Sequence, residues 1–98
     1  DDTLYDRFKV IHVPGHTPGS ICLLDQELRA LFPGDLVYEE NGVLYEIPSQ
    51  YSLDPSANRE QIRKMLEYEF KHVLPSHGKP ILGNGYEKWR ELVEKLMK

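Results

Sequence analysis

Three segments of this sequence share one arrangement: a strand-like run ends, glycine or proline sharpens the turn, and a potential metal ligand follows. The segments are Pro14-Gly15-His16-Thr17-Pro18-Gly19-Ser20, Phe32-Pro33-Gly34-Asp35 and Leu74-Pro75-Ser76-His77-Gly78. Glycine and proline hold such loops in unusual backbone paths, and loops at strand ends often carry the functional groups of a fold. We therefore predict that His16, Asp35 and His77 belong to one site.

The rest of the pattern predicts a mixed α/β fold that forms a single domain over residues 1–98. Three apolar or β-branched runs are predicted as a β-meander: residues 8–13, 21–24 and 28–32. The second run is apolar at every position, as in a strand that is covered on both faces. Residues 39–55 are predicted as a long loop around a tight turn at Asn41-Gly42, with a short hairpin as the alternative.

Two amphipathic helices with a brief strand between them complete the prediction. Asp54 is predicted to cap a helix of about four turns that starts at Pro55. Residues 72–74 form the brief strand, and Asn84 caps the last helix. The apolar faces of the helices are Ile62, Met65, Leu66 and Phe70 in the first, and Trp89, Leu92, Val93 and Leu96 in the second.

Charge and apolar content exclude several classes of partner. The chain carries 16 Asp and Glu against 12 Lys and Arg, and it lacks the basic stripe that nucleic acid requires. No apolar run approaches the roughly 20 residues of a membrane span. Cys22 is the only cysteine, so no internal disulfide can form. With no signal peptide visible, these features predict a cytoplasmic protein.

The residue types in the three segments favour metal-assisted hydrolysis. Imidazole and carboxylate together suit zinc, iron or manganese. A bound metal lowers the pKa of water toward neutrality, which supplies hydroxide as a nucleophile. Cys22 lies within an apolar strand, and no serine occupies a nucleophile-elbow motif. The sequence therefore predicts a metal-dependent hydrolase site that includes His16, Asp35 and His77.

The three segments resemble the last three motifs of the metallo-β-lactamase-fold hydrolases, and of glyoxalase II-like members in particular. The resemblance covers about residues 8–82. It implies that His16 binds one metal, that His77 binds the other, and that Asp35 bridges both, with two zinc ions in a complete site. It also implies an αββα sandwich of two similar halves, of which this chain would be the C-terminal half.

One departure from the family pattern limits what the chain can do alone. The family's H-x-H-x-D-H motif, which supplies most of the other ligands, is absent: the histidines are His12, His16, His72 and His77. Each metal would then receive two ligands, whereas catalytic zinc usually takes three from the protein. We therefore expect the isolated chain to bind metal poorly and to be inactive.

Two arrangements could complete the site. The chain could be a fragment that lacks an N-terminal half, which its start at Asp1 rather than Met favours. Alternatively, two copies could pair about a two-fold axis and imitate the two halves, which would make the isolated chain a homo-oligomer.

Other residues near the motifs have two interpretations each. Thr17 and Ser20 would hydrogen-bond the metal ligands or would stabilise their loop. Tyr38 and Tyr45, together with Ile47, Pro48 and Tyr51, would line an apolar substrate pocket or would only pack the long loop.

The predicted activity is attack by metal-bound hydroxide on a small-molecule substrate, with an ester or thioester bond favoured by the resemblance. Two alternatives stay open. One is an iron-dependent oxidoreductase on the same fold, and the other is a non-catalytic half-fold that dimerises.

Overall fold

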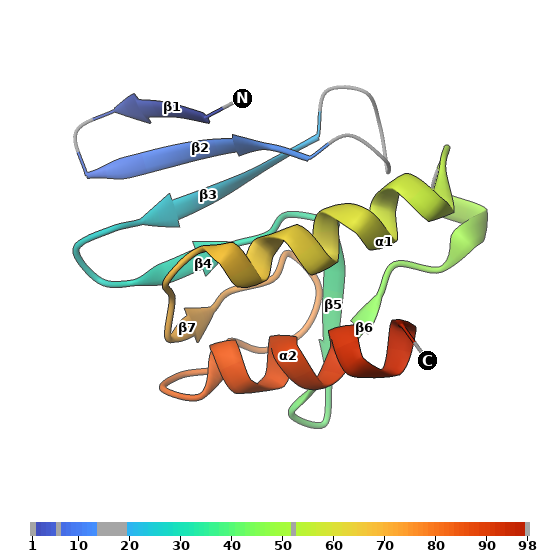
Figure 1. Ribbon diagram of the computed structural model, residues 1–98. Coiled ribbons are helices and arrows are strands. Elements are labelled where there is room, and N and C mark those ends of the chain that lie inside the picture. The colour runs from blue at the N-terminus through green and yellow to red at the C-terminus, as the bar shows by residue number, and fades with distance from the viewer. Residues whose placement is uncertain (1, 6, 14–19, 52, 98) are drawn as a thin grey trace.

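The computed structural model describes residues 2–5, 7–13, 20–51 and 53–97 (Figure 1). Its elements are β1 (Asp2–Tyr5), β2 (Phe8–His12), β3 (Ile21–Asp25), β4 (Ala30–Phe32), β5 (Val37–Glu40), β6 (Val43–Glu46), α1 (Pro55–Lys64), β7 (His72–Val73) and α2 (Gly85–Leu96), with 3₁₀ turns at Ser49–Tyr51 and Met65–Glu67. The predicted α/β class is confirmed, as is the order of a meander followed by helix, strand and helix.

One five-stranded sheet, in the order β1-β2-β3-β4-β7, determines where the three motifs lie. The first four strands are antiparallel neighbours, and β7 runs parallel to β4. Since β2 and β4 both run opposite to β3, the strands β2, β4 and β7 share one direction. Their C-terminal ends therefore lie at the same edge of the sheet, and each of the three predicted ligand segments follows one of these ends.

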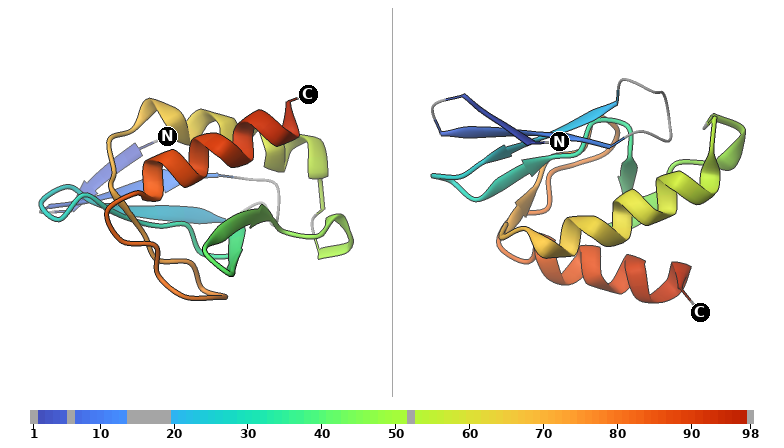
Figure 2. Two further views of the ribbon diagram at one scale, coloured as in Figure 1. Left: turned by 90° about the horizontal axis from the view of Figure 1, so that it is seen from below. Right: turned by 45° about the horizontal axis from the view of Figure 1, so that its top comes forward.

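The core fills the space between one face of this sheet and both helices. Ile11, Cys22 and Leu31 contribute from the strands, and Ile62 and Trp89 contribute from α1 and α2, all five at 0% exposure. The two helices lie side by side against the sheet (Figure 2). Trp89 joins them, because its indole N–H donates to the carbonyl of Ile62 at 2.7 Å.

The opposite face of the sheet is apolar but only partly covered. Val10, Leu23 and Phe32 pair in register across β2, β3 and β4 and are each half-buried. In β3, Cys22 is buried toward the helices while Ile21 is 48% exposed. The expectation that residues 21–24 are covered on both faces is therefore wrong for this chain, because both helices pack on the other face.

The segment predicted as a long loop begins with a hairpin. β5 and β6 pair around Asn41 and Gly42, whose φ angles of 54° and 79° suit a two-residue hairpin turn. The alternative of a short hairpin is correct, and the irregular part of the chain begins only after Glu46.

The helices differ in detail from their predictions. Asp54 caps α1 as expected, with its carboxylate accepting from the N–H of Ala57 at 3.1 Å. However, α1 ends at Lys64 and continues as a 3₁₀ turn, so Phe70 lies beyond the helix. Asn84 precedes α2 as predicted, but its side chain makes no capping hydrogen bond. In the part of the chain that the structure describes, neither helix has the length and apolar character needed to cross a membrane.

Candidate metal centre

Asp35 and His77 come together at the sheet edge where the parallel strands β4 and β7 end. Asp35 follows β4 after Pro33 and Gly34, and His77 follows β7 four residues after Val73. His77 Nε2 lies 3.3 Å from Asp35 Oδ1, and the two side chains are 76% and 44% exposed. Even between two charged groups, a contact this exposed contributes little to stability, typically about 0–1 kcal/mol. The stability of the fold therefore depends little on this contact.

The separation of these two atoms fits ligands of a single metal ion. Zinc binds imidazole nitrogen and carboxylate oxygen at about 2.0–2.2 Å in tetrahedral sites, which places two such ligands about 3.4 Å apart. The observed distance of 3.3 Å is close to that value. The donor types also suit iron and manganese. The distance between these atoms of Asp35 and His77 is thus compatible with two ligands of one metal ion.

Backbone hydrogen bonds hold the Asp35 loop in place. The N–H of Leu36 donates to the carbonyl of Pro33 at 3.2 Å, and the N–H of Ser76 donates to the carbonyl of Gly34 at 3.3 Å. The second bond joins the Asp35 loop to the His77 loop directly. Because Gly34 has φ of 62°, a conformation that glycine adopts without strain, the turn can aim Asp35 outward.

Glu39 on β5 fixes the loop that carries His77, a role that sequence analysis missed. Its backbone N–H donates to the carbonyl of His77 at 3.1 Å, and its carboxylate accepts from the N–H of Lys79 at 2.6 Å and of Gly42 at 2.7 Å. These N–H donors, that of Lys79 first, lower the pKa of Glu39. In the sequence, the only signal for such a role is that Glu39 lies close to the Asn41-Gly42 turn, which its side chain could stabilise.

Gly78 is the residue where this loop tolerates no side chain. It has φ of 107°, and an added Cβ would lie 2.4 Å from the carbonyl oxygen of Glu39. Gly83 has a similar φ of 87° but no atom within 4 Å of an added Cβ. Comparing alanine at the two positions therefore separates the clash from the backbone strain.

We expect Gly78→Ala to destabilise the protein by about 1–3 kcal/mol more than Gly83→Ala, the usual range for overpacking. The variant should also weaken metal binding, because the His77 loop must move away from Glu39. Urea unfolding and metal titration of both variants measure the two effects. Equal stability and equal metal affinity in the two variants would show that Glu39 does not fix the loop.

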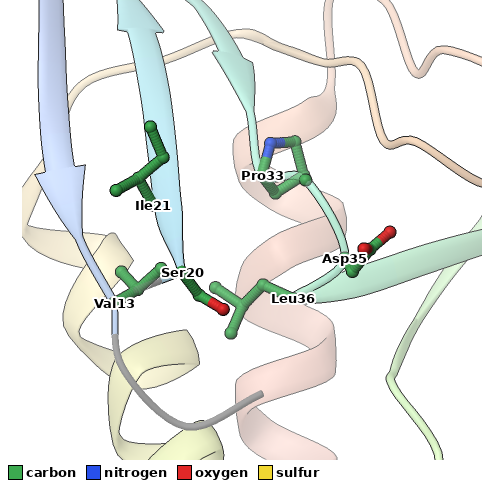
Figure 3. A pocket seen from close by; sticks show the side chains of 7 residues that line it. Val13, Ser20, Ile21, Pro33, Asp35 and Leu36 are labelled. Carbon is green, nitrogen blue, oxygen red and sulfur yellow. The ribbon is translucent and has the colours of Figure 1, made fainter. Parts of the chain in front are cut away.

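His16 and Thr17 lie outside the described residues, but the two ends of their segment are placed. The N–H of Val13 donates to the carbonyl of Ser20 at 2.9 Å, so the two residues that flank the segment lie side by side at the edge of the sheet. Val13 and Ser20 line a pocket of about 160 Å³ together with Ile21, Pro33, Gly34, Asp35 and Leu36. In Figure 3 the Asp35 side chain points away from Ser20.

Within the described ranges, no group of three or more His, Cys, Asp or Glu side chains could hold a metal by itself. Cys22 is buried, which raises the pKa of its thiol to about 12, and its Sγ lies 3.7 Å from the carbonyl of Pro33. It therefore stays a neutral core residue beneath the Asp35 turn, as expected.

A larger pocket of about 480 Å³ opens beside Asp35 and His77. Its other walls are Val37, Tyr38, Ile47, Pro48 and Tyr51. Tyr38, named as a pocket residue from the sequence, lines this pocket. Tyr45, the other residue named, is not among the lining residues; its ring stacks on that of Tyr38 with centroids 5.4 Å apart, and Lys95 lies over the Tyr45 ring.

Residues 6–77 match the sequence model of the family described as the metallo-beta-lactamase superfamily. The chain belongs to the metallo-beta-lactamase superfamily. Among its relatives is the acyl-coenzyme A thioesterase MBLAC2 of Gallus gallus, 35% identical over 76% of this chain and 27% of that protein. The beta-lactamase-like protein 2 homolog of Caenorhabditis elegans is 32% identical over 92% of this chain and 28% of its own length.

Solved structures of the superfamily share the fold. An archaeal member from Sulfolobus tokodaii superposes with a TM-score of 0.74 at 20% identity, covering 100% of this chain and 37% of that one. TTHA1623 in a di-iron-bound form gives 0.61 at 27% identity, covering 86% of this chain and 44% of that one. The chain thus spans about a quarter of the curated relatives above, and less than half of these superfamily structures.

Proposed function

We propose that this chain supplies part of the metal site of a hydrolase, with His16, Asp35 and His77 as its ligands. The observation that carries the proposal is the 3.3 Å approach of His77 Nε2 to Asp35 Oδ1 at the edge where β4 and β7 end. The family assignment supports hydrolysis, and the named thioesterase relative supports an ester or thioester as substrate.

Each residue of the chain has a distinct part in this proposal. When bound, a divalent metal lowers the pKa of a water ligand and polarises a carbonyl oxygen. Asp35 contributes negative charge and His77 a neutral imidazole nitrogen. The exposed sides of both residues face the larger pocket, where a substrate carbonyl can approach. His16 would be the third ligand, since its segment leaves and returns at the same sheet edge.

Paramagnetic mapping tests the site independently of activity. Mn²⁺ added to the ¹⁵N-labelled chain should broaden the amide resonances of Gly34, Leu36, Ser76 and Gly78 before those of α2. The broadening should disappear in the Asp35→Asn, His77→Ala double variant. Equal broadening in both proteins, or broadening centred on an acidic stretch of α2, would contradict the proposal.

Zinc is the proposed metal, and iron is the second candidate because TTHA1623 is described in a di-iron-bound form. Elemental analysis of protein purified without chelators distinguishes them. Because the described part of the chain holds no complete ligand group, we propose that other ligands come from a missing N-terminal half or from a second copy.

The half-buried apolar row of Val10, Leu23 and Phe32 gives a test of self-association. We expect the isolated chain to pair through this face, because a second copy can cover what the helices leave open. Leu23→Lys should weaken the dimer at least about tenfold, equivalent to about 1.4 kcal/mol. Sedimentation velocity measures the change, with Leu82→Lys at an exposed loop position as the control. A monomeric wild-type chain, or identical dimers in both variants, would contradict the expectation.

A further inference from the structure

The larger pocket beside Asp35 and His77 has a chemical character that limits what it can bind. Its remaining walls are Val37, Tyr38, Ile47, Pro48 and Tyr51. Three of these are aliphatic or proline, two are aromatic, and none carries a charge. A carboxylate or phosphate group inside the pocket would find no cation among these residues, so they favour an uncharged apolar group.

The walls are held in position before any ligand arrives. Tyr38 stacks on Tyr45 with an interplanar angle of 23°. The N–H of Ile47 donates to the carbonyl of Leu36 at 3.4 Å, which joins the pocket to the segment that follows Asp35. The N–H of Tyr51 donates to the carbonyl of Pro48 at 2.9 Å and closes a turn. A preformed pocket reduces the ordering that accompanies binding.

The pocket also presents apolar surface to water. Tyr51 is 59% exposed although it is a large aromatic residue. Covering such surface with a ligand's hydrocarbon is favourable in proportion to the area removed from water. Binding of an apolar group at the open side of the pocket is therefore favourable.

We propose that this pocket binds the hydrophobic acyl group of the substrate, either alkyl or aryl. The proposal rests on the proposed function and names its substrate class: esters or thioesters of uncharged, apolar carboxylic acids. With the acyl group against Tyr38, Ile47 and Tyr51, the acyl carbonyl can approach Asp35 and His77, which line the same pocket. Acids with a second carboxylate would be poor acyl donors, because that charge would enter the apolar walls.

Binding of neutral, non-hydrolysable acyl amides tests the pocket. Butanamide, pentanamide and hexanamide are titrated into the ¹⁵N-labelled chain in EDTA, so that no metal contributes. Shifts should centre on Tyr38, Ile47 and Tyr51. Affinity should rise about two- to fourfold for each added CH₂. Succinamate, with a charged end, should bind at least about fivefold more weakly than butanamide.

Variants separate the pocket from nonspecific binding. Tyr51→Ser should weaken hexanamide binding at least about fivefold, while Leu82→Ser, at a position that is 67% exposed in another loop, should leave it unchanged. Both substitutions are at exposed positions, and matching amide spectra verify that the fold is retained. Affinity independent of chain length, or equal effects of the two variants, would overturn the proposal. If the acyl amides bind but Mn²⁺ does not broaden resonances near Asp35 and His77, the pocket is supported and the metal site is rejected. If Mn²⁺ broadens those resonances but the acyl amides do not bind, the metal site is supported and the pocket proposal is rejected.

Discussion

Asp35→Asn should remove both metals from a completed site, whereas His77→Ala should remove only one. The difference follows from the roles that the family resemblance implies, in which Asp35 bridges the metals and His77 binds one of them. Asparagine keeps the size of the side chain but loses the charge that holds two cations close together. Each substitution should weaken metal binding by more than the roughly 10- to 100-fold typical of outer hydrogen-bonding partners.

The measurement needs a protein in which the other ligands are present. A fusion of residues 1–98 behind the N-terminal part of the thioesterase relative is designed to supply the upstream ligands that the family resemblance implies. Metal content by elemental analysis and thioester hydrolysis are then compared across variants. We expect Asp35→Asn to lower hydrolysis at least about 100-fold, or about 2.7 kcal/mol. His12→Gln, at an exposed histidine on β2, is the control and should retain metal. Equal metal loss in the Asp35 and His77 variants would contradict the bridging role.

The approach of Asp35 to His77 was predictable because it depends on the order of strands rather than on fine packing. Each residue follows a recognisable strand and a proline-containing turn. Once β4 and β7 are parallel neighbours, their C-terminal ends share an edge. Short apolar runs with glycine or proline after them are strong local signals. The position of these two residues therefore follows from local features and one rule of sheet geometry.

The features that were not predicted depend on contacts between distant segments. Glu39 accepts from Lys79, forty residues along the chain, and nothing in the local sequence indicates that contact. The incomplete burial of one face of β3 also depends on contacts between distant segments. Ile21 and Leu23 are apolar like Cys22 and Leu24, but burial depends on which face the helices cover. A run of apolar residues cannot distinguish a strand buried by its own chain from one that requires a partner.

The same dependence on distant contacts makes Trp89 the residue whose loss should affect stability most. It is 0% exposed, packs edge-on against Phe70 at 5.7 Å, and donates its indole N–H to the carbonyl of Ile62. It thereby joins α2 to α1 and to the turn that leads into β7. We expect Trp89→Ala to lower the free energy of unfolding by about 3–5 kcal/mol, the usual range for truncating a buried aromatic side chain.

Urea unfolding of three variants tests how that stability is distributed. Trp89→Phe keeps ring packing but loses the indole hydrogen bond, so it should fall between wild type and Trp89→Ala. Glu94→Ala, at an exposed position of α2, should change stability by less than about 0.5 kcal/mol. Since small domains have total stabilities of about 5–15 kcal/mol, the loss expected for Trp89→Ala removes between about a fifth and all of the stability. Metal binding at His77 should then fall with the folded fraction, because α2 packs on β7, which leads to that residue. A loss below about 1 kcal/mol in Trp89→Ala would mean that the helices are not held together through this residue.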